Sequence, residues 1–323
     1  RHSMTSPELD LLTIGRISVD LYAEQLHVPL AEVRTFRKSV GGTATNVAVA
    51  AARLGHRAAV FTKVGDDAFG GYIKQALQHT FGVDTRFVGT HPTLRTPLAF
   101  AELLDPGDPT IVFYREPAAP DMTILETEID MQVVRSVPIL WVPAGTLAFQ
   151  PSRDTVMTVL RERARREHTI LDLDWRPALW HGDEAAASAA VAEVLPLATM
   201  AIGNREECRI AVGTADPNEA ADRLLGLGLS AAIVKMGGDG VLVATADGER
   251  VQVAPRRVDV VCGLGAGDAF GGAICHGLLE GWPLVRCAEA GNAAGAIVAS
   301  RLMCADDMPT QADIEEMLSD GAV

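Results

Sequence analysis

The 323-residue sequence contains no apolar run that approaches the roughly 18 residues needed to cross a bilayer. It also lacks the GxxxxGKS/T motif and the GxGxxG fingerprint, so it has neither a Walker-type phosphate loop nor a standard dinucleotide-binding turn. Its first ten residues, RHSMTSPELD, contain no hydrophobic signal core, and we attribute residues 1–3 to an expression-vector remnant. We therefore expect a cytoplasmic protein without a membrane partner.

Cysteine and basic residues are also scarce. The five cysteines form no CxxC pair and have no Cys/His metal spacing, which indicates reduced, buried thiols. The 28 lysines and arginines are outnumbered by 42 acidic residues, which gives a net charge of −14. This balance argues against nucleic acid as a partner, although it is compatible with a local basic pocket for a small anion.

The hydrophobic residues that are present form short strand-like runs that alternate with helical patterns. The length suffices for one large domain, or for a large domain with a small appendage. Strands are predicted at residues 11–15, 57–65, 138–145, 168–174, 197–204, 230–238 and 239–247. Helices are predicted at residues 44–55, 69–82, 152–168 and 216–228. This order predicts an α/β fold, with a mainly parallel sheet covered by helices on both faces.

Two segments, 16–40 and 94–117, break this alternation. Both contain alternating polar and apolar residues without an intervening helix, and they predict a small antiparallel sheet apart from the main one. Such a sheet is expected to act as a lid or a dimer surface, and simple edge hairpins are the alternative. Its open edge favours a homodimer formed through the lid.

The segment GLGAGDAF follows a strand-like run and opens a helix-like one. Gly265, Ala266 and Gly267 have little or no side chain, so an anion can approach their N–H groups at the positive end of the helix. Asp268 would repel a phosphate, unless its task is to take a proton from a hydroxyl that attacks phosphorus. The alternative is a tight turn with an aspartate cap.

A second glycine turn, GGTATN, precedes a helix rich in small residues. Gly41 and Gly42 would let a polyol lie against the backbone, and Asn46 can both donate to and accept from hydroxyls. Asp20, which is expected just after a strand, could bind neighbouring hydroxyls. A plain helix entry and a turn aspartate are the alternatives.

Two further segments carry polar groups beside predicted strands. VKMGGDGVLV predicts a hairpin with a turn of two or three residues, with Lys235 beside it, on which a nucleotide could rest. In NREE, Asn204 and Glu207 lie three residues apart on a first helical turn and could organise waters around Mg²⁺. The alternatives are an ordinary hairpin and an ordinary N-cap.

Taken together and in this order, the motifs resemble those of the ribokinase-like (PfkB) family of sugar kinases over residues 10–318. The resemblance implies one kinase domain, a three-layer α/β/α sandwich with a β-sheet lid, and ATP-dependent phosphorylation of a sugar hydroxyl. It implies that Asp268 is the catalytic base and that Gly265, Ala266 and Gly267 provide the anion hole. The sugar would be bound by Asp20, Gly41, Gly42 and Asn46.

The same resemblance assigns residues to the nucleotide and its metal ion. The implied nucleotide-binding residues are Asn204, Lys235, Gly237, Gly240 and Asn292, and Glu207 would hold Mg²⁺ through water. Many members have Asp-Thr-Thr before Gly-Ala-Gly-Asp, whereas this chain has Cys262, Gly263 and Leu264. A K⁺ requirement therefore stays open.

Two arginines favour an acidic sugar as the substrate. Arg115 follows a predicted lid strand and Arg176 follows a core strand in LDLDWRPALW; a guanidinium binds a carboxylate through paired hydrogen bonds. Both segments resemble kinases of keto-deoxy sugar acids, with 5-dehydro-2-deoxygluconate, an intermediate of inositol catabolism, preferred over 2-keto-3-deoxygluconate. Alternatively, Arg176 pairs with Asp172 or Asp174 and Arg115 is a surface residue. A fructokinase-like enzyme and a sugar- or nucleotide-sensing protein are the other functions considered.

Overall fold

The computed structural model describes residues 8–320, so the attribution of residues 1–3 falls outside the described residues. These residues form a main sheet of nine strands in the order β13-β12-β11-β10-β9-β8-β1-β4-β5. The strands are β1 (Leu11–Ile14), β4 (Ala58–Gly65), β5 (Val88–His91), β8 (Ile139–Pro143), β9 (Thr169–Asp172), β10 (Met200–Asn204), β11 (Ala231–Lys235), β12 (Val241–Thr245) and β13 (Arg250–Val253). From β5 to β11 all neighbours are parallel, and β12 and β13 are added antiparallel.

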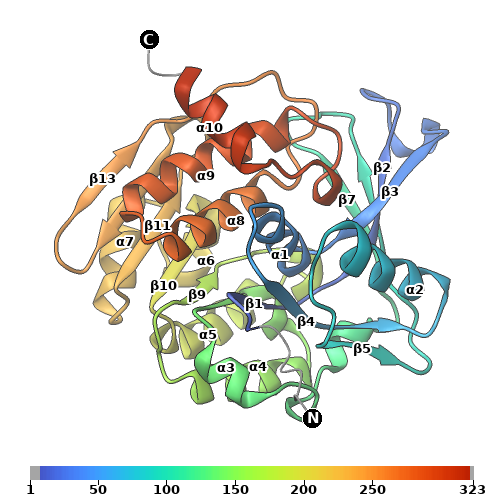
Figure 1. Ribbon diagram of the computed structural model, residues 1–323, viewed down its shortest axis with the longest axis horizontal. Coiled ribbons are helices and arrows are strands. Elements are labelled where there is room, and N and C mark those ends of the chain that lie inside the picture. Colours follow the sequence, from blue (N-terminus) through green and yellow to red (C-terminus); the bar gives the residue numbers. More distant parts are fainter. Residues whose placement is uncertain (1–7, 321–323) are drawn as a thin grey trace, which may run out of the picture.

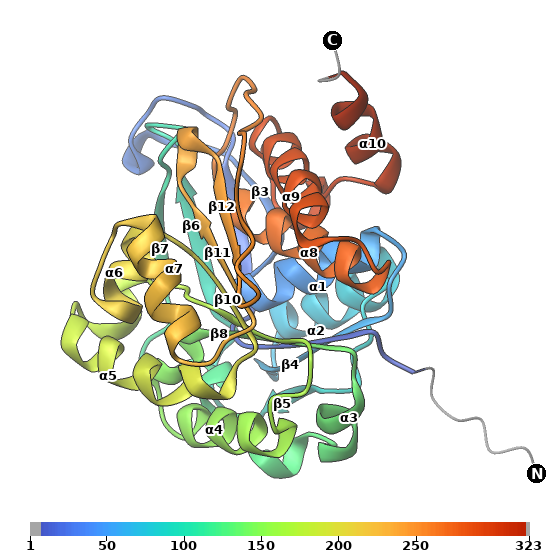
Figure 2. The same cartoon turned by 90° about the vertical axis from the view of Figure 1, so that its left-hand side faces the viewer.

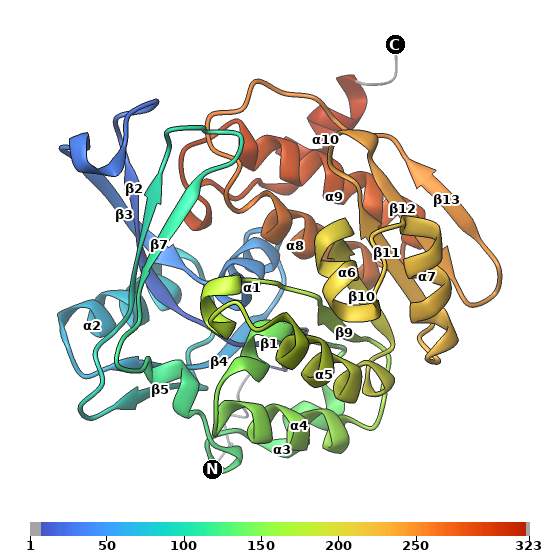
Figure 3. The same ribbon diagram turned by 180° about the vertical axis from the view of Figure 1, so that it is seen from behind.

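Helices cover both faces of this sheet and complete three layers (Figures 1 and 2). One face carries α1 (Thr43–Arg53), α2 (Ala68–Gln75), α8 (Ala266–Leu279), α9 (Leu284–Ala299) and α10 (Gln311–Asp320). The other face, seen in Figure 3, carries α3 (Met131–Ser136), α4 (Ser152–Arg163), α5 (Glu184–Val194), α6 (Arg205–Val212) and α7 (Pro217–Gly226).

The parallel strands read as continuous apolar runs because both of their faces are buried. In β1, Leu11 belongs to the core beneath α1 and α8, whereas Leu12 and Ile14 belong to the core beneath α4 and α5. The predicted α/β sandwich is thereby confirmed. No helix within residues 8–320 combines the length and the hydropathy needed to span a membrane.

A second sheet lies beside the main one, formed by β3 (Phe36–Gly41), β2 (Ser18–Ala23), β6 (Leu98–Glu102) and β7 (Thr110–Tyr114) in that order (Figure 3). We refer to these four strands as the small sheet. The prediction that it is antiparallel was wrong at its centre, because β2 and β6 are parallel. They follow β1 and β5, which end at the same edge of the main sheet, so both strands enter the small sheet in one direction.

Two local predictions also need correction. The helix predicted over 152–168 ends at Arg163, where Ala164 (φ 53°) and Arg165 (φ 56°) take left-handed backbone angles. The turn between β11 and β12 contains five residues rather than two or three, because Lys235 pairs with Val241 and a short helical turn occupies 237–239.

Candidate functional site

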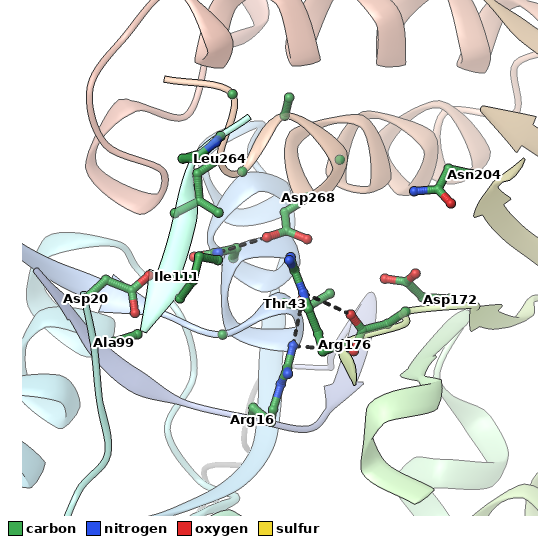
Figure 4. A pocket seen from close by; sticks show the side chains of 18 of the residues that line it. Arg16, Asp20, Thr43, Ala99, Ile111, Asp172, Arg176, Asn204, Leu264 and Asp268 are labelled. Atoms are coloured by element: carbon green, nitrogen blue, oxygen red, sulfur yellow. Dashed lines mark hydrogen bonds and ion pairs between the residues drawn. The ribbon is translucent and has the colours of Figure 1, made fainter. Parts of the chain in front are cut away.

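A cavity opens at the carboxyl ends of the main-sheet strands, beneath the small sheet. Its volume is about 600 Å³, and Asp172, Asn204 and Lys235, the last residues of β9, β10 and β11, all line it. In open α/β sheets, ligands bind at this edge where the strand order reverses; here β1 lies between β4 and β8 at that point. Figure 4 shows side chains from several elements converging on the cavity.

The start of α8 brings Asp268 into this cavity. Gly265 caps the helix with a left-handed φ of 84°, and a Cβ atom there would overlap Cys304 Sγ, so only glycine fits. Asp268 then lies in the first turn, where its Oδ2 accepts a hydrogen bond from Asn46 Nδ2 at 2.8 Å. The other amide atom, Asn46 Oδ1, is buried without a partner in the described structure. It is available to accept a bond from a bound hydroxyl.

Asn46 and Asp268 meet because α1 and α8 pack closely. Gly272 of α8 touches Ala50 of α1, and a Cβ atom at position 272 would overlap it. Gly271 gives similar room to Trp141 of β8. The small residues that the sequence places in both helices therefore fix the separation of the Asp268 carboxylate and the Asn46 amide.

The surroundings of Asp268 make it a stronger base than an ordinary aspartate. Loss of solvation raises its pKa to about 6, although the Asn46 amide and the nearby Arg176 act in the opposite direction. The group is therefore mainly ionised at pH 7, with a proton affinity closer to that pH than a free carboxylate has. A general base works best under this condition.

Asp20 enters the cavity from the small sheet. It lies within β2 rather than after a strand as predicted, and it is buried, with hydrogen bonds from Ser18 Oγ (2.7 Å) and Tyr22 Oη (3.3 Å). Burial raises its pKa to about 6. Gly41 does not line the cavity but makes room for the Asp20 carboxylate, which any Cβ at position 41 would overlap. Gly42, with φ 101°, lines the cavity at the start of α1.

Both arginines expected to recognise an acid line the cavity, and both already have carboxylate neighbours. Arg115 is buried just beyond β7 and forms an ion pair with the buried Asp121. Arg176 is half-exposed, and its Nε lies 3.7 Å from Asp174 Oδ1. The alternative of an Arg176–Asp174 pair is thus present in the structure, whereas a surface position for Arg115 is not.

The residues expected to bind nucleotide divide into two groups. Asn204, Lys235 and Gly237 line the cavity. Gly240 and Asn292 do not: Gly240 lies against the Val253 carbonyl, and Asn292 Nδ2 donates to the Ala254 carbonyl at 2.9 Å.

Asn204 and Glu207 form a reciprocal cap at the start of α6. Asn204 Oδ1 accepts from the Glu207 N–H (2.8 Å), and Glu207 Oε1 accepts from the Asn204 N–H (2.9 Å). The other oxygen of Glu207 accepts from the Trp175 N–H at 3.2 Å. The alternative that this pair forms an N-cap is therefore correct. Both residues also line the cavity.

The sequence did not identify several polar residues that line the cavity, among them Asp172, Arg16 and Thr43. Asp172 is buried at the end of β9, and burial together with the Asp174 and Glu207 carboxylates raises its pKa well above the usual value. Arg16 lies two residues after the end of β1, and Thr43 is the first residue of α1. Asp172 and Arg16 could have been found in the sequence, because each is a polar residue close to the end of a predicted core strand, where ligands bind in such sheets.

The residues on this side of the cavity fit a divalent cation. Asp172 and Glu207 concentrate negative charge: burial is the main cause of the raised pKa of Asp172, and the Asp174 and Glu207 carboxylates add a repulsion that a cation would relieve. Each Glu207 oxygen already accepts one N–H but retains a lone pair, which suits contact through water.

Comparisons with known proteins agree with this geometry. The chain matches the pfkB family carbohydrate kinase profile over residues 8–311. It is 34% identical over 322 residues to 5-dehydro-2-deoxygluconokinase of Geobacillus thermodenitrificans, with 96% of this chain and 93% of the relative covered. It is 35% identical over 311 residues to the Photobacterium profundum enzyme of that name, with 94% and 92% covered.

The fold is also that of a solved structure, a putative ribokinase II from E. coli in complex with ATP and Mg²⁺. The TM-score is 0.87 at 24% identity, with 97% of this chain and 99% of the other covered.

Proposed function

Because the chain belongs to the pfkB family of carbohydrate kinases, we propose that it transfers the γ-phosphoryl group of ATP to the primary hydroxyl of an acidic keto-deoxy sugar, 5-dehydro-2-deoxygluconate. The enzyme class, a phosphotransferase with an alcohol acceptor, follows from the family. The choice of substrate is supported by the names of the relatives at 34–35% identity and by two arginines in the cavity. The observation that carries the proposal is the Asn46–Asp268 pair at the start of α8.

In the proposed reaction, Asp268 accepts the proton of the sugar hydroxyl as its oxygen attacks the γ-phosphorus. A bond forms between that oxygen and phosphorus, the bond from phosphorus to the β–γ bridging oxygen breaks, and ADP leaves. The N–H groups of Gly265, Ala266 and Gly267 stabilise the charge on the transferring group at the positive end of α8. Asn46 holds the base in position and offers Oδ1 to a sugar hydroxyl.

The sugar would lie between the small sheet and α1. Asp20, with Gly42 beside it, is placed to accept from sugar hydroxyls, and Gly41 allows the Asp20 carboxylate its position. Arg115 and Arg176 would face the carboxylate of the acid. The small sheet would act as a lid that excludes water.

ATP would occupy the other half of the cavity, toward β10 and β11. Asn204, Lys235 and Gly237 line that half, and Asp172 and Glu207 would hold Mg²⁺ through water. When bound, the cation neutralises charge on the phosphates of ATP. Gly240 would support the turn between β11 and β12, and Asn292 would hold α9 through its bond to the Ala254 carbonyl.

We also propose a homodimer formed through the small sheet, in the cytoplasm. Phe36, Phe100 and Tyr114 form a chain of edge-to-face ring contacts on this sheet, and Tyr114 is 61% exposed. A second copy would cover these rings. All five cysteines are buried free thiols, which suits a reducing compartment.

The test is ADP release from Mg-ATP with 5-dehydro-2-deoxygluconate, 2-keto-3-deoxygluconate, fructose, ribose and adenosine. We expect turnover to be confined to the two acids, with the first preferred. Asp268→Asn should lower kcat by about 10²–10⁴-fold while the protein remains folded. A best rate with fructose would instead favour the fructokinase-like alternative, and binding of both ligands without ADP release would favour a sensor.

A further inference from the structure

Arg16 lies at the junction of the two sheets, and its backbone is fixed there. Its carbonyl oxygen accepts a hydrogen bond from Thr45 Oγ1 at 3.1 Å. Gly42 is packed against the same carbonyl, which any Cβ at position 42 would overlap. The following residue, Ile17, donates its N–H to Asp121 Oδ2 at 3.1 Å. Because the main chain is held on both sides, adjustment at this position is confined to the Arg16 side chain.

The guanidinium of Arg16 is buried but poorly paired. Its Nη2 lies 3.3 Å from Thr43 Oγ1 and 3.4 Å from Asp174 Oδ2, whereas charge-assisted N–H···O bonds usually measure about 2.7–2.9 Å. Its Nη1 is covered by protein and has no hydrogen-bond partner in the described structure. A buried charged donor without an acceptor is destabilising, so the group lacks a partner that a ligand could supply.

Arg16 shares its surroundings with two other arginines. Burial lowers the pKa of Arg16, the Asp174 carboxylate raises it, and Arg115 and Arg176 are close enough to lower it further. Asp121 pairs with Arg115, while Asp174 lies between Arg16 (3.4 Å) and Arg176 (3.7 Å). Three guanidinium groups therefore share two contacting carboxylates, while Asp20 acts on Arg16 and Asp268 on Arg176 at longer range. Arg115 Nε is a second buried donor without an acceptor.

We propose that Arg16 determines the choice of an acidic over a neutral sugar by donating to the substrate carboxylate. The inference rests on the proposed function, which assigns only Arg115 and Arg176 to that group. A carboxylate supplies two charged acceptor oxygens, which matches the two unpartnered donors, Arg16 Nη1 and Arg115 Nε. On binding, the Arg16 guanidinium turns so that Nη1 faces the cavity, which Arg16 already lines together with Arg176 (Figure 4).

A neutral sugar cannot replace the carboxylate at this position. A hydroxyl offers one uncharged acceptor oxygen, so it cannot supply the two charge-assisted hydrogen bonds that these buried donors lack. A site built around a specific polar partner discriminates strongly against an analogue that lacks it, because its own groups are then left unpaired. Arg16 is thus a specificity residue, whereas proton transfer remains the task of Asp268.

The experiment compares Arg16→Gln and Arg16→Lys with the wild type in two measurements. The first is kcat and KM for 5-dehydro-2-deoxygluconate and for fructose, together with KM for ATP. The second is calorimetric titration with gluconate and with glucose in the absence of ATP. The matched control is Arg135→Gln. It removes an exposed arginine of α3 that pairs with Glu162 of α4 and does not line the cavity.

We expect Arg16→Gln to raise KM for the acid by about 10- to 100-fold and to weaken gluconate binding to a similar extent. The ratio of kcat/KM for acid over fructose should fall accordingly, and KM for ATP should change little. Arg16→Lys should restore only part of the difference, because lysine keeps the charge but not the two-pronged donor. Arg135→Gln should match the wild type throughout.

Two outcomes overturn the inference, and they can be told apart. A wild type that prefers the acid, with both Arg16 variants unchanged in KM and in gluconate binding, refutes the role of Arg16 and leaves the proposed function intact. A wild type that prefers fructose and does not bind gluconate refutes both. If Arg16→Gln does not fold, Arg16→Lys decides, and unchanged discrimination between acid and fructose in that variant refutes the role.

Discussion

Replacing Asn46 with leucine should shift the acid limb of the pH–rate profile toward neutral pH. Asn46 Nδ2 donates to Asp268 Oδ2 at 2.8 Å and thereby stabilises the ionised base. Hydrogen bonds to charged groups contribute about 1.5–3 kcal/mol, and one pKa unit corresponds to about 1.36 kcal/mol. The cavity is open to water, so we take the lower end. Because the amide lowers the pKa, its removal should raise the pKa of Asp268 from about 6 to about 7.

The assay is kcat/KM for the sugar acid between pH 5 and pH 9, measured by ADP release. For the wild type, activity should fall as the pH drops through about 6, where protonation removes the base. Asp20 has a pKa in the same range and contributes to that limb, but only the Asp268 component should move in Asn46→Leu. Asn218→Leu, on the exposed surface, is the control. A limb that stays near pH 6 in a folded Asn46→Leu variant would refute the assignment of Asp268 as the titrating base.

Three further predictions concern the framework and the cation. Gly265→Ala should lower both kcat and Tm, since alanine in the left-handed region costs about 1–2 kcal/mol and its Cβ would also overlap Cys304; normal kcat and Tm would contradict this. Arg163→Met should lower the free energy of unfolding by about 3 kcal/mol in denaturant titration, because the buried guanidinium donates to four backbone carbonyls, including those of Val134 and His168; a loss below 1 kcal/mol would argue against those bonds. Chelation with EDTA should abolish ADP release and added Mg²⁺ should restore it, whereas activity that persists in EDTA would remove the proposed roles of Asp172 and Glu207.

The part of the site that could be predicted from the sequence lies on contiguous segments. Gly265 to Asp268 form a glycine turn followed by a helix, and that local order is sufficient to place a carboxylate at a helix start. Asn204 and Glu207 likewise occupy one helical turn, and their capping geometry follows from their spacing.

The part that could not be predicted depends on partners far apart in the chain. Arg16 contacts Asp174, 158 residues away, so nothing near Arg16 in the sequence shows what surrounds it. Asn292 was assigned to the nucleotide by the family resemblance, but its side chain donates to the Ala254 carbonyl, 38 residues earlier in the chain. The parallel pairing of β2 with β6 likewise depends on where β1 and β5 end in space.

The close packing of α1 against α8 has a consequence for how the substrate range of this fold can change. Asn46 and Asp268 sit on two helices whose spacing is set by Gly272 against Ala50, deep in the core. Asp20 and Arg115, by contrast, come from the small sheet and its edges. The residues proposed for proton transfer therefore lie on the packed helix pair, whereas those proposed for selectivity are divided between the small sheet with its edges and the segments after β1 and β9, which carry Arg16 and Arg176. New sugars can be accommodated by altering the small sheet and these two segments while the proton-transfer geometry is inherited unchanged.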